Sequence, residues 1–120
     1  MHSNDLISYL NVALAPFLKN GKRFAGFKPG WLAGLSEIVA EIRENHESAV
    51  ARRAMAIVAY RFGLCGETPK TLKEIANMSW LHRGRVVSET TISHIILRDS
   101  GKWLRDPELA SKVMKLLVIT

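Results

Sequence analysis

The sequence has few of the residues that build disulfides, metal centres or catalytic sites. It contains one cysteine, Cys65, which cannot form an internal disulfide, and its four histidines lack the spacing of metal ligands. It also has no glycine-rich phosphate loop and no nucleophile motif around the cysteine. We therefore expect no metal, no cofactor and no enzymatic activity. A single free cysteine fits a reducing cytoplasm best.

Long hydrophobic runs are also missing. The first apolar stretch follows an acid rather than a basic residue and is interrupted by Pro16, so we expect neither a secretory signal nor a membrane span. Of the 120 residues, 48% are hydrophobic and 23% are charged, which is typical of a globular protein. This length is enough for a core without metals or disulfides. The sequence thus predicts one domain over residues 1–120, with no membrane partner.

No segment shows sustained alternation of apolar and polar residues, which would indicate strands. Apolar residues instead recur at helical spacing, so we predict an all-α, compact bundle of five or six helices. The segment 49–62 is apolar on almost every side, with Ser48 as its N-cap and Gly63 as its C-cap. Such a pattern is typical of a central helix that several others contact.

The two ends of the chain are less regular. Residues 20–30 contain three glycines and a proline, which predict a loop. The same segment interleaves basic and aromatic side chains, a pattern that either binds single-stranded nucleic acid or pins a loop to its own core. A last helix, starting at Pro107, has an apolar stripe that either packs into the core or joins two copies in a homodimer. The stripe comprises Leu109, Val113, Leu116 and Leu117.

Two short helices are predicted over residues 71–98. Thr71 and Glu74 have the spacing of a capping box, in which a hydroxyl and a carboxylate bind the free amides at a helix start. Ser88 can cap a second helix, which we expect to end at Ser100 and Gly101. Three isoleucines on this helix form an apolar stripe, and its polar side chains face solvent. The stripe is Ile92, Ile95 and Ile96, and the polar side chains are Thr90, Thr91, Ser93 and His94.

This pair is typical of a helix-turn-helix unit, whose second helix enters the major groove of double-stranded DNA. Short hydroxyl and imidazole groups near the N-terminus of that helix can meet base edges. The chain has a net charge of +6, and basic side chains gather where phosphate contacts would be needed. The predicted DNA-binding residues are Arg83, Arg85, Ser88, Thr90, Thr91, Ser93, His94, Arg98 and Lys102.

Residues 51–86 resemble the C-terminal promoter-recognition domain of bacterial sigma factors. In that family a helix ends in an arginine, an aromatic residue, glycine and leucine, and a Gly-Glu turn and a new helix follow. The matching segments here are Arg61–Leu64, Gly66–Glu67 and Thr71–Ile75. An ungapped continuation places residues 82–86 at the start of the family's recognition helix. The resemblance implies a transcription-associated, DNA-binding fold.

The recognition helix therefore has two candidate positions. Either the turn is enlarged and the helix starts at Ser88, or it starts near Trp80–His82, as in the sigma-like register. We favour the enlarged turn because Ser88 is the better cap. The predicted function is a sequence-specific, DNA-binding transcriptional regulator. The alternatives are a plain helical hairpin in a core and a helical protein-interaction module or adaptor, with RNA polymerase or a sigma factor as its candidate partner.

Overall fold

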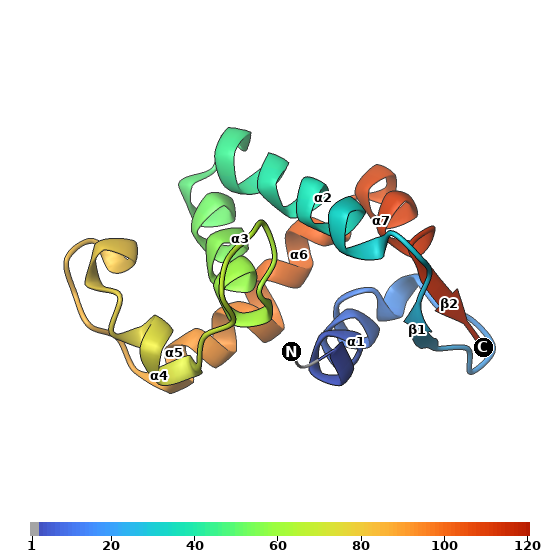
Figure 1. The fold of residues 1–120 in the computed structure, drawn as a ribbon, viewed down its shortest axis with the longest axis horizontal. Coiled ribbons are helices and arrows are strands. Elements are labelled where there is room, and N and C mark those ends of the chain that lie inside the picture. Colours follow the sequence, from blue (N-terminus) through green and yellow to red (C-terminus); the bar gives the residue numbers. More distant parts are fainter. Residues whose placement is uncertain (1–2) are drawn as a thin grey trace.

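The computed structural model describes residues 3–120, which assemble around one hydrophobic core. The molecule is elongated, with extents of 43 × 28 × 25 Å (Figure 1). When the continuous run over residues 89–104 is counted once, the described residues form six α-helices, which confirms the all-α prediction. In chain order the elements are α1 (Ser3–Ala13), η1 (Ala15–Phe17), β1 (Phe24–Phe27), α2 (Trp31–Asn45), α3 (Ala49–Phe62), α4 (Leu72–Ala76), η2 (Ser79–His82), α5 (Glu89–His94), η3 (Ile95–Ser100), α6 (Gly101–Leu104), α7 (Pro107–Met114) and β2 (Leu117–Ile119).

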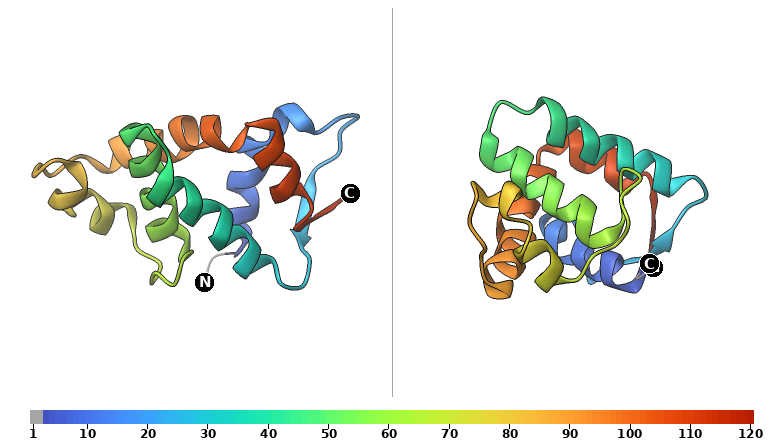
Figure 2. Two further views of the ribbon diagram at one scale, coloured as in Figure 1. Left: turned by 90° about the horizontal axis from the view of Figure 1, so that it is seen from above. Right: turned by 60° about the vertical axis from the view of Figure 1, so that its left-hand side comes forward.

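Helix α3 lies at the centre of the core, as its sequence predicts. The Ser48 hydroxyl accepts a hydrogen bond from the Ala51 amide at 3.3 Å, and Gly63 ends the helix with a left-handed φ of 69°. Most side chains between these caps are buried, and α2, η3 and α4 all pack against them. Figure 2 shows α3 enclosed between α2 and the long helical run. The core is therefore built around one helix with almost no free face.

The long helical run over residues 89–104 corrects the expected end at Ser100 and Gly101. A π-helical segment, η3, joins α5 to α6 without a break. The buried Ser100 hydroxyl donates to the Ile96 carbonyl and contacts the Tyr9 hydroxyl, both at 2.6 Å. These contacts satisfy polar groups that a π segment displaces from the regular ladder. Burial raises the pKa of Tyr9 above its usual range, so its hydroxyl stays protonated.

Gly101 continues this helix because of tertiary packing. A Cβ at this position would lie 3.4 Å from both the Cα and the Cβ of Ala13, so the missing side chain lets α1 approach closely. Its φ of −58° is helical. The sequence signal for a helix break is thus overruled by contact with α1.

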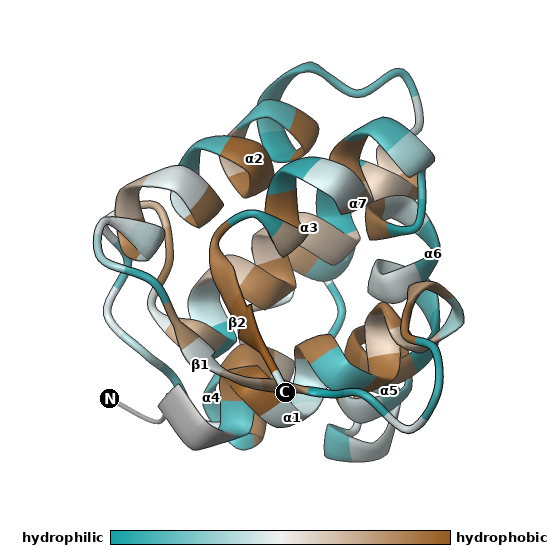
Figure 3. Ribbon diagram, turned by 90° about the vertical axis from the view of Figure 1, so that its right-hand side faces the viewer, coloured by the Kyte–Doolittle hydropathy of each residue, from teal (hydrophilic) through white to brown (hydrophobic). Residues whose placement is uncertain are grey.

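The predicted loop over residues 20–30 contains a strand, which is the second correction. Strand β1 pairs antiparallel with β2, and Phe27 faces Leu117 in the register. The Asn11 side chain binds both the amide and the carbonyl of Phe24, at 2.9 and 3.0 Å, which fixes the strand to α1. Phe24 is fully buried. Figure 3 shows the apolar β2 beside β1, so the end of the chain packs on its own fold.

The C-terminal apolar stripe packs in part against the chain's own core. Helix α7 starts at Pro107, as predicted, with the Asp106 carboxylate as its N-cap, and it ends at Met114. Val113 and Leu117 are fully or almost fully buried against the rest of the chain. Leu109 and Leu116 are only half-buried, so the stripe is partly covered, and a homodimer joined partly through this helix stays a prediction.

The central position of α3 predicts that Ile57→Asp unfolds the protein. Ile57 is fully buried, and an unpaired buried carboxylate costs several kcal/mol, against a total stability of about 5 to 15 kcal/mol. Val50→Asp is the matched control, because Val50 is 60% exposed in the first turn of the same helix. Circular dichroism and urea denaturation measure both variants. A cooperatively folded Ile57→Asp variant would contradict the central position of α3.

The end of α3 generates a second prediction, at two glycines with left-handed φ. A Cβ on Gly63 would lie 2.6 Å from Cγ of Pro69, whereas a Cβ on Gly66 would meet open space. Both alanine variants incur backbone strain of about 1 to 2 kcal/mol. We expect Gly63→Ala to lose a further ~1 to 3 kcal/mol from the clash. Urea midpoints compare the two, and equal losses would contradict the close packing of Pro69 on the helix end.

Candidate nucleic-acid interface

Helix α4 begins with the predicted capping box. The Thr71 hydroxyl accepts from the Glu74 amide at 3.1 Å, and the Glu74 carboxylate accepts from the Thr71 amide at 3.0 Å. Ile75 and Ala76 then bury the inner face of this short helix. Helices α4 and α5 pack together at one end of the long axis, far from the β1–β2 pair (Figure 1). The two predicted helices therefore meet in space.

The connection between them is an enlarged turn. It contains the short 3-10 helix η2, after which Arg83 and Gly84 take left-handed φ angles of 58° and 82°. No helix covers residues 83–88, so the recognition helix of the sigma-like register does not form there. The Val87 amide donates a hydrogen bond to the Ala76 carbonyl at 3.1 Å. This bond holds the end of the turn against the end of α4. The first helix after the turn is therefore the run beginning with α5.

The start of α5 is capped by Ser88, as predicted. Its hydroxyl accepts from the Thr91 amide at 3.1 Å and also contacts the Thr91 hydroxyl at 2.9 Å. Thr90 and His94 are exposed. Thr91 is half-buried and its hydroxyl contacts that of Ser88, so it is less available to solvent than predicted. Ser93 is half-buried too. It lines a groove beside α1, so it does not lie on the outer face of the helix as predicted.

The predicted basic residues do not all gather at this end. Arg83 and Arg85 are exposed in the turn, and Arg98 is exposed on η3. Lys102 lies on α6, where its ammonium group is 5.1 Å from the Trp103 ring centroid. Lys102 is 14 positions beyond Ser88 along one continuous helix, or about 20 Å. Lys102 therefore belongs to the opposite end of the helix, because the helix does not break at Ser100.

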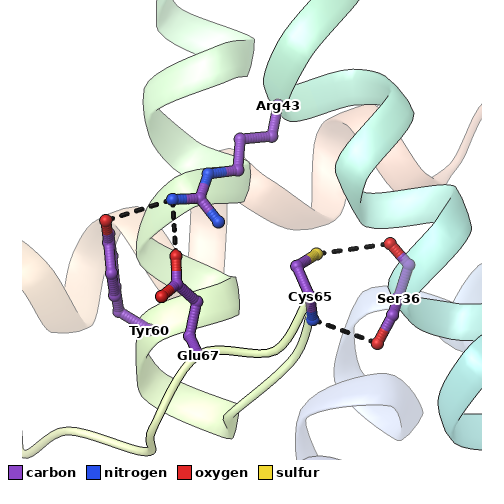
Figure 4. A network of polar contacts seen from close by, with 5 residues as sticks. All are labelled: Ser36, Arg43, Tyr60, Cys65 and Glu67. Carbon is purple, nitrogen blue, oxygen red and sulfur yellow. Dashed lines mark hydrogen bonds and ion pairs between the residues drawn. The ribbon is translucent and has the colours of Figure 1, made fainter.

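A polar network holds the segment between α3 and α4 (Figure 4). The Arg43 guanidinium binds the Glu67 carboxylate at 2.7 Å and the Tyr60 hydroxyl at 3.0 Å. The Cys65 amide donates to the Ser36 hydroxyl, and its thiol donates to the Ser36 carbonyl. Burial raises the pKa of the Cys65 thiol, so we assign this cysteine a structural role. The network ties the connection between α3 and α4 to α2.

Two residues at this end of the molecule escaped the sequence analysis. Glu89 is exposed in the first turn of α5, beside Thr90. Arg53, on α3, has its Nη2 atom 2.9 Å from Nδ1 of the buried His82. Nothing in the sequence connects Arg53 with His82, because they are 29 positions apart. The capped first turn could have indicated Glu89, whereas only the fold brings Arg53 to η2.

Comparisons of the chain with known families, proteins and structures found no similar protein. No family model matches the chain, and no curated protein or solved structure gives a significant match. Within residues 3–120, no helix is both long enough and apolar enough to cross a bilayer. Across the same residues, no three His, Cys, Asp or Glu side chains gather as a metal site would require. The geometry of the α4–α5 end is therefore the basis for the functional argument.

The capping box predicts a pH-dependent part of the stability. The Thr71 backbone N–H lowers the pKa of Glu74 below its usual range, so this cap stabilises the fold above the usual glutamate pKa. That contribution is lost as pH falls through the lowered pKa. In Glu74→Gln an acceptor remains that cannot titrate. We expect the advantage of the wild type over this variant at neutral pH to shrink below pH ~4. Parallel curves of Tm against pH would contradict this role.

Proposed function

We propose that the protein is a sequence-specific, DNA-binding transcriptional regulator that inserts the N-terminal half of α5 into the major groove. The observation that supports this most directly is the exposed polar first turn of a long, firmly anchored helix. Glu89 and Thr90 are exposed in this first turn, His94 is exposed in the next turn, and arginines lie in the connection before the helix. Side chains in this position on a groove-inserted helix are those that reach base edges.

The anchoring of α5 favours recognition over a passive packing role. The isoleucines that follow the polar turn are buried, and Ser100 and Gly101 fix the distant end of the helix against α1. A helix held this way presents its first turn in one orientation. Recognition groups on rigid elements lose little conformational entropy on binding, which helps them to discriminate among sequences.

The polar and basic side chains divide into two roles in this proposal. Thr90 and His94 contact base edges, and Glu89 accepts a hydrogen bond from the amino group of a cytosine. Arg83, Arg85 and Arg98 contact phosphates, which position the protein without reading sequence. Ser88 and Thr91 support the first turn through their mutual hydrogen bond. Lys102 lies outside the contacted surface.

A helical protein-interaction module is the competing function, with RNA polymerase as the proposed partner. Salt dependence separates the two functions, because phosphate contacts release counterions and make DNA affinity fall steeply with salt. A homodimer would match a site with two half-sites and remains a prediction of this proposal.

The division of roles predicts different losses on mutation. A preferred duplex is first selected from a random pool with the wild-type protein. His94→Ala should then lose preference for that duplex over a scrambled one by about 1 to 3 kcal/mol. Arg85→Ala should weaken both duplexes alike and reduce the slope of log K against log salt by about one. Fluorescence anisotropy at several salt concentrations measures both effects.

Arg23→Ala is the matched control, because this exposed arginine lies beside β1 at the opposite end of the molecule. We expect it to change neither the preference nor the slope. A loss of sequence preference in Arg85→Ala would instead assign base recognition to the turn. Absence of salt-sensitive duplex binding by the wild type would reject the proposed function and favour the protein-interaction module.

A further inference from the structure

A basic pocket lies between the N-terminal part of α3 and the turn that follows η2. Its volume is about 390 Å³, and it is lined by Ala49, Val50, Arg53, Leu81, His82 and Arg83. No acidic side chain is among these lining residues. The pocket therefore combines two guanidinium groups and an imidazole with apolar walls, an arrangement that favours a bound anion.

Arg53 has a charge that no carboxylate balances within residues 3–120. The ion pairs in this part of the chain use other basic groups, namely Arg43 and Lys112. The one hydrogen bond of the Arg53 side chain joins Nη2 to His82, and its buried Nε has no partner. A guanidinium has five N–H donors. The buried Nε–H is thus left unpaired, at a cost in stability that a hydrogen bond to an anion would offset.

His82 determines the direction of this guanidinium. The His82 ring is buried, and its Nε2 lies 2.8 Å from the Ile75 carbonyl, which can only accept a hydrogen bond. Nε2 therefore donates, and Nδ1 is left to accept from Arg53. The histidine is a positioning residue, because it joins α3 to the turn and orients the arginine beside the cavity.

We propose that this pocket binds a phosphate group, with Arg53 and Arg83 as its ligands. A tetrahedral phosphate can accept hydrogen bonds from two separate guanidinium groups, whereas a planar carboxylate matches the fork of one. Arg83 suits this role because its left-handed backbone ends η2 at the pocket and its side chain is exposed. The apolar side chains of Val50 and Leu81 reduce solvent screening around the bound charge.

The phosphate has two possible sources. One is a backbone phosphate of duplex DNA, which rests on the proposed function and adds α3 to the contact surface. The other is free phosphate, which does not depend on that function. Because Arg83 directly precedes the segment leading to α5, a backbone phosphate held here would also fix the position of α5 on the duplex.

The first experiment titrates the wild-type protein with inorganic phosphate and follows its amide and arginine Nε–H resonances by NMR. We expect saturable shifts in residues 49–53 and 82–84. Arg53→Gln should weaken phosphate binding at least about tenfold, the effect expected for a lost charge-assisted hydrogen bond. Arg83→Gln, a change at an exposed side chain, should weaken it as well, so the test does not depend on one variant folding. Arg23→Gln removes the same charge far from the pocket and should have no effect.

The second experiment measures duplex affinity against salt for the same proteins. Arg53→Gln should reduce the salt slope by about one without changing sequence preference. Phosphate binding by a wild type that does not bind DNA would support the pocket and reject the proposed function. Unchanged phosphate binding in Arg53→Gln and Arg83→Gln would overturn the inference, whatever the protein does with DNA. So would shifts confined to residues outside the pocket.

Discussion

The burial of α3 on almost every side is the constraint on which the rest of the structure depends. A helix with no free face needs neighbours all round, and α2, α4 and η3 supply them. Burial of its apolar side chains favours folding, since each large side chain removed from water contributes about 1.5 to 3 kcal/mol. Each end of α3 also directs the chain. Ser48 fixes the turn from α2, and Gly63 starts the segment that leads to α4.

The long helix connects this core to the candidate interface. Its C-terminal half is fixed by the Tyr9–Ser100 contact and by the close approach of Gly101 to α1. Its first turn remains polar and exposed at one end of the molecule (Figure 2). The π segment lies between these halves and changes the helical phase, so that buried residues on both sides face the core. The orientation of the exposed turn therefore depends on packing some distance away from it.

The turn between α4 and α5 is the second point where distant residues meet. The pair of Arg53 and His82 joins α3 to η2, while the Arg43–Glu67 contact fixes the connection between α3 and α4 against α2. One of these arginines is paired with a carboxylate and the other is not. This difference separates a structural contact from a candidate binding site, because the half-buried Arg53 has a buried Nε–H that a bound anion would satisfy.

Local signals in the sequence determined much of this protein. The capping box at Thr71, the caps at Ser48, Ser88 and Asp106, and the apolar α3 all follow from short-range chemistry, which a helix satisfies within one or two turns. Tertiary structure alone decided the pairing of β1 with β2, the continuation of the helix through Gly101 and the meeting of Arg53 with His82. Those features depend on residues far apart in the chain, whose contacts overrule local preference because burial and hydrogen bonding contribute more than propensity.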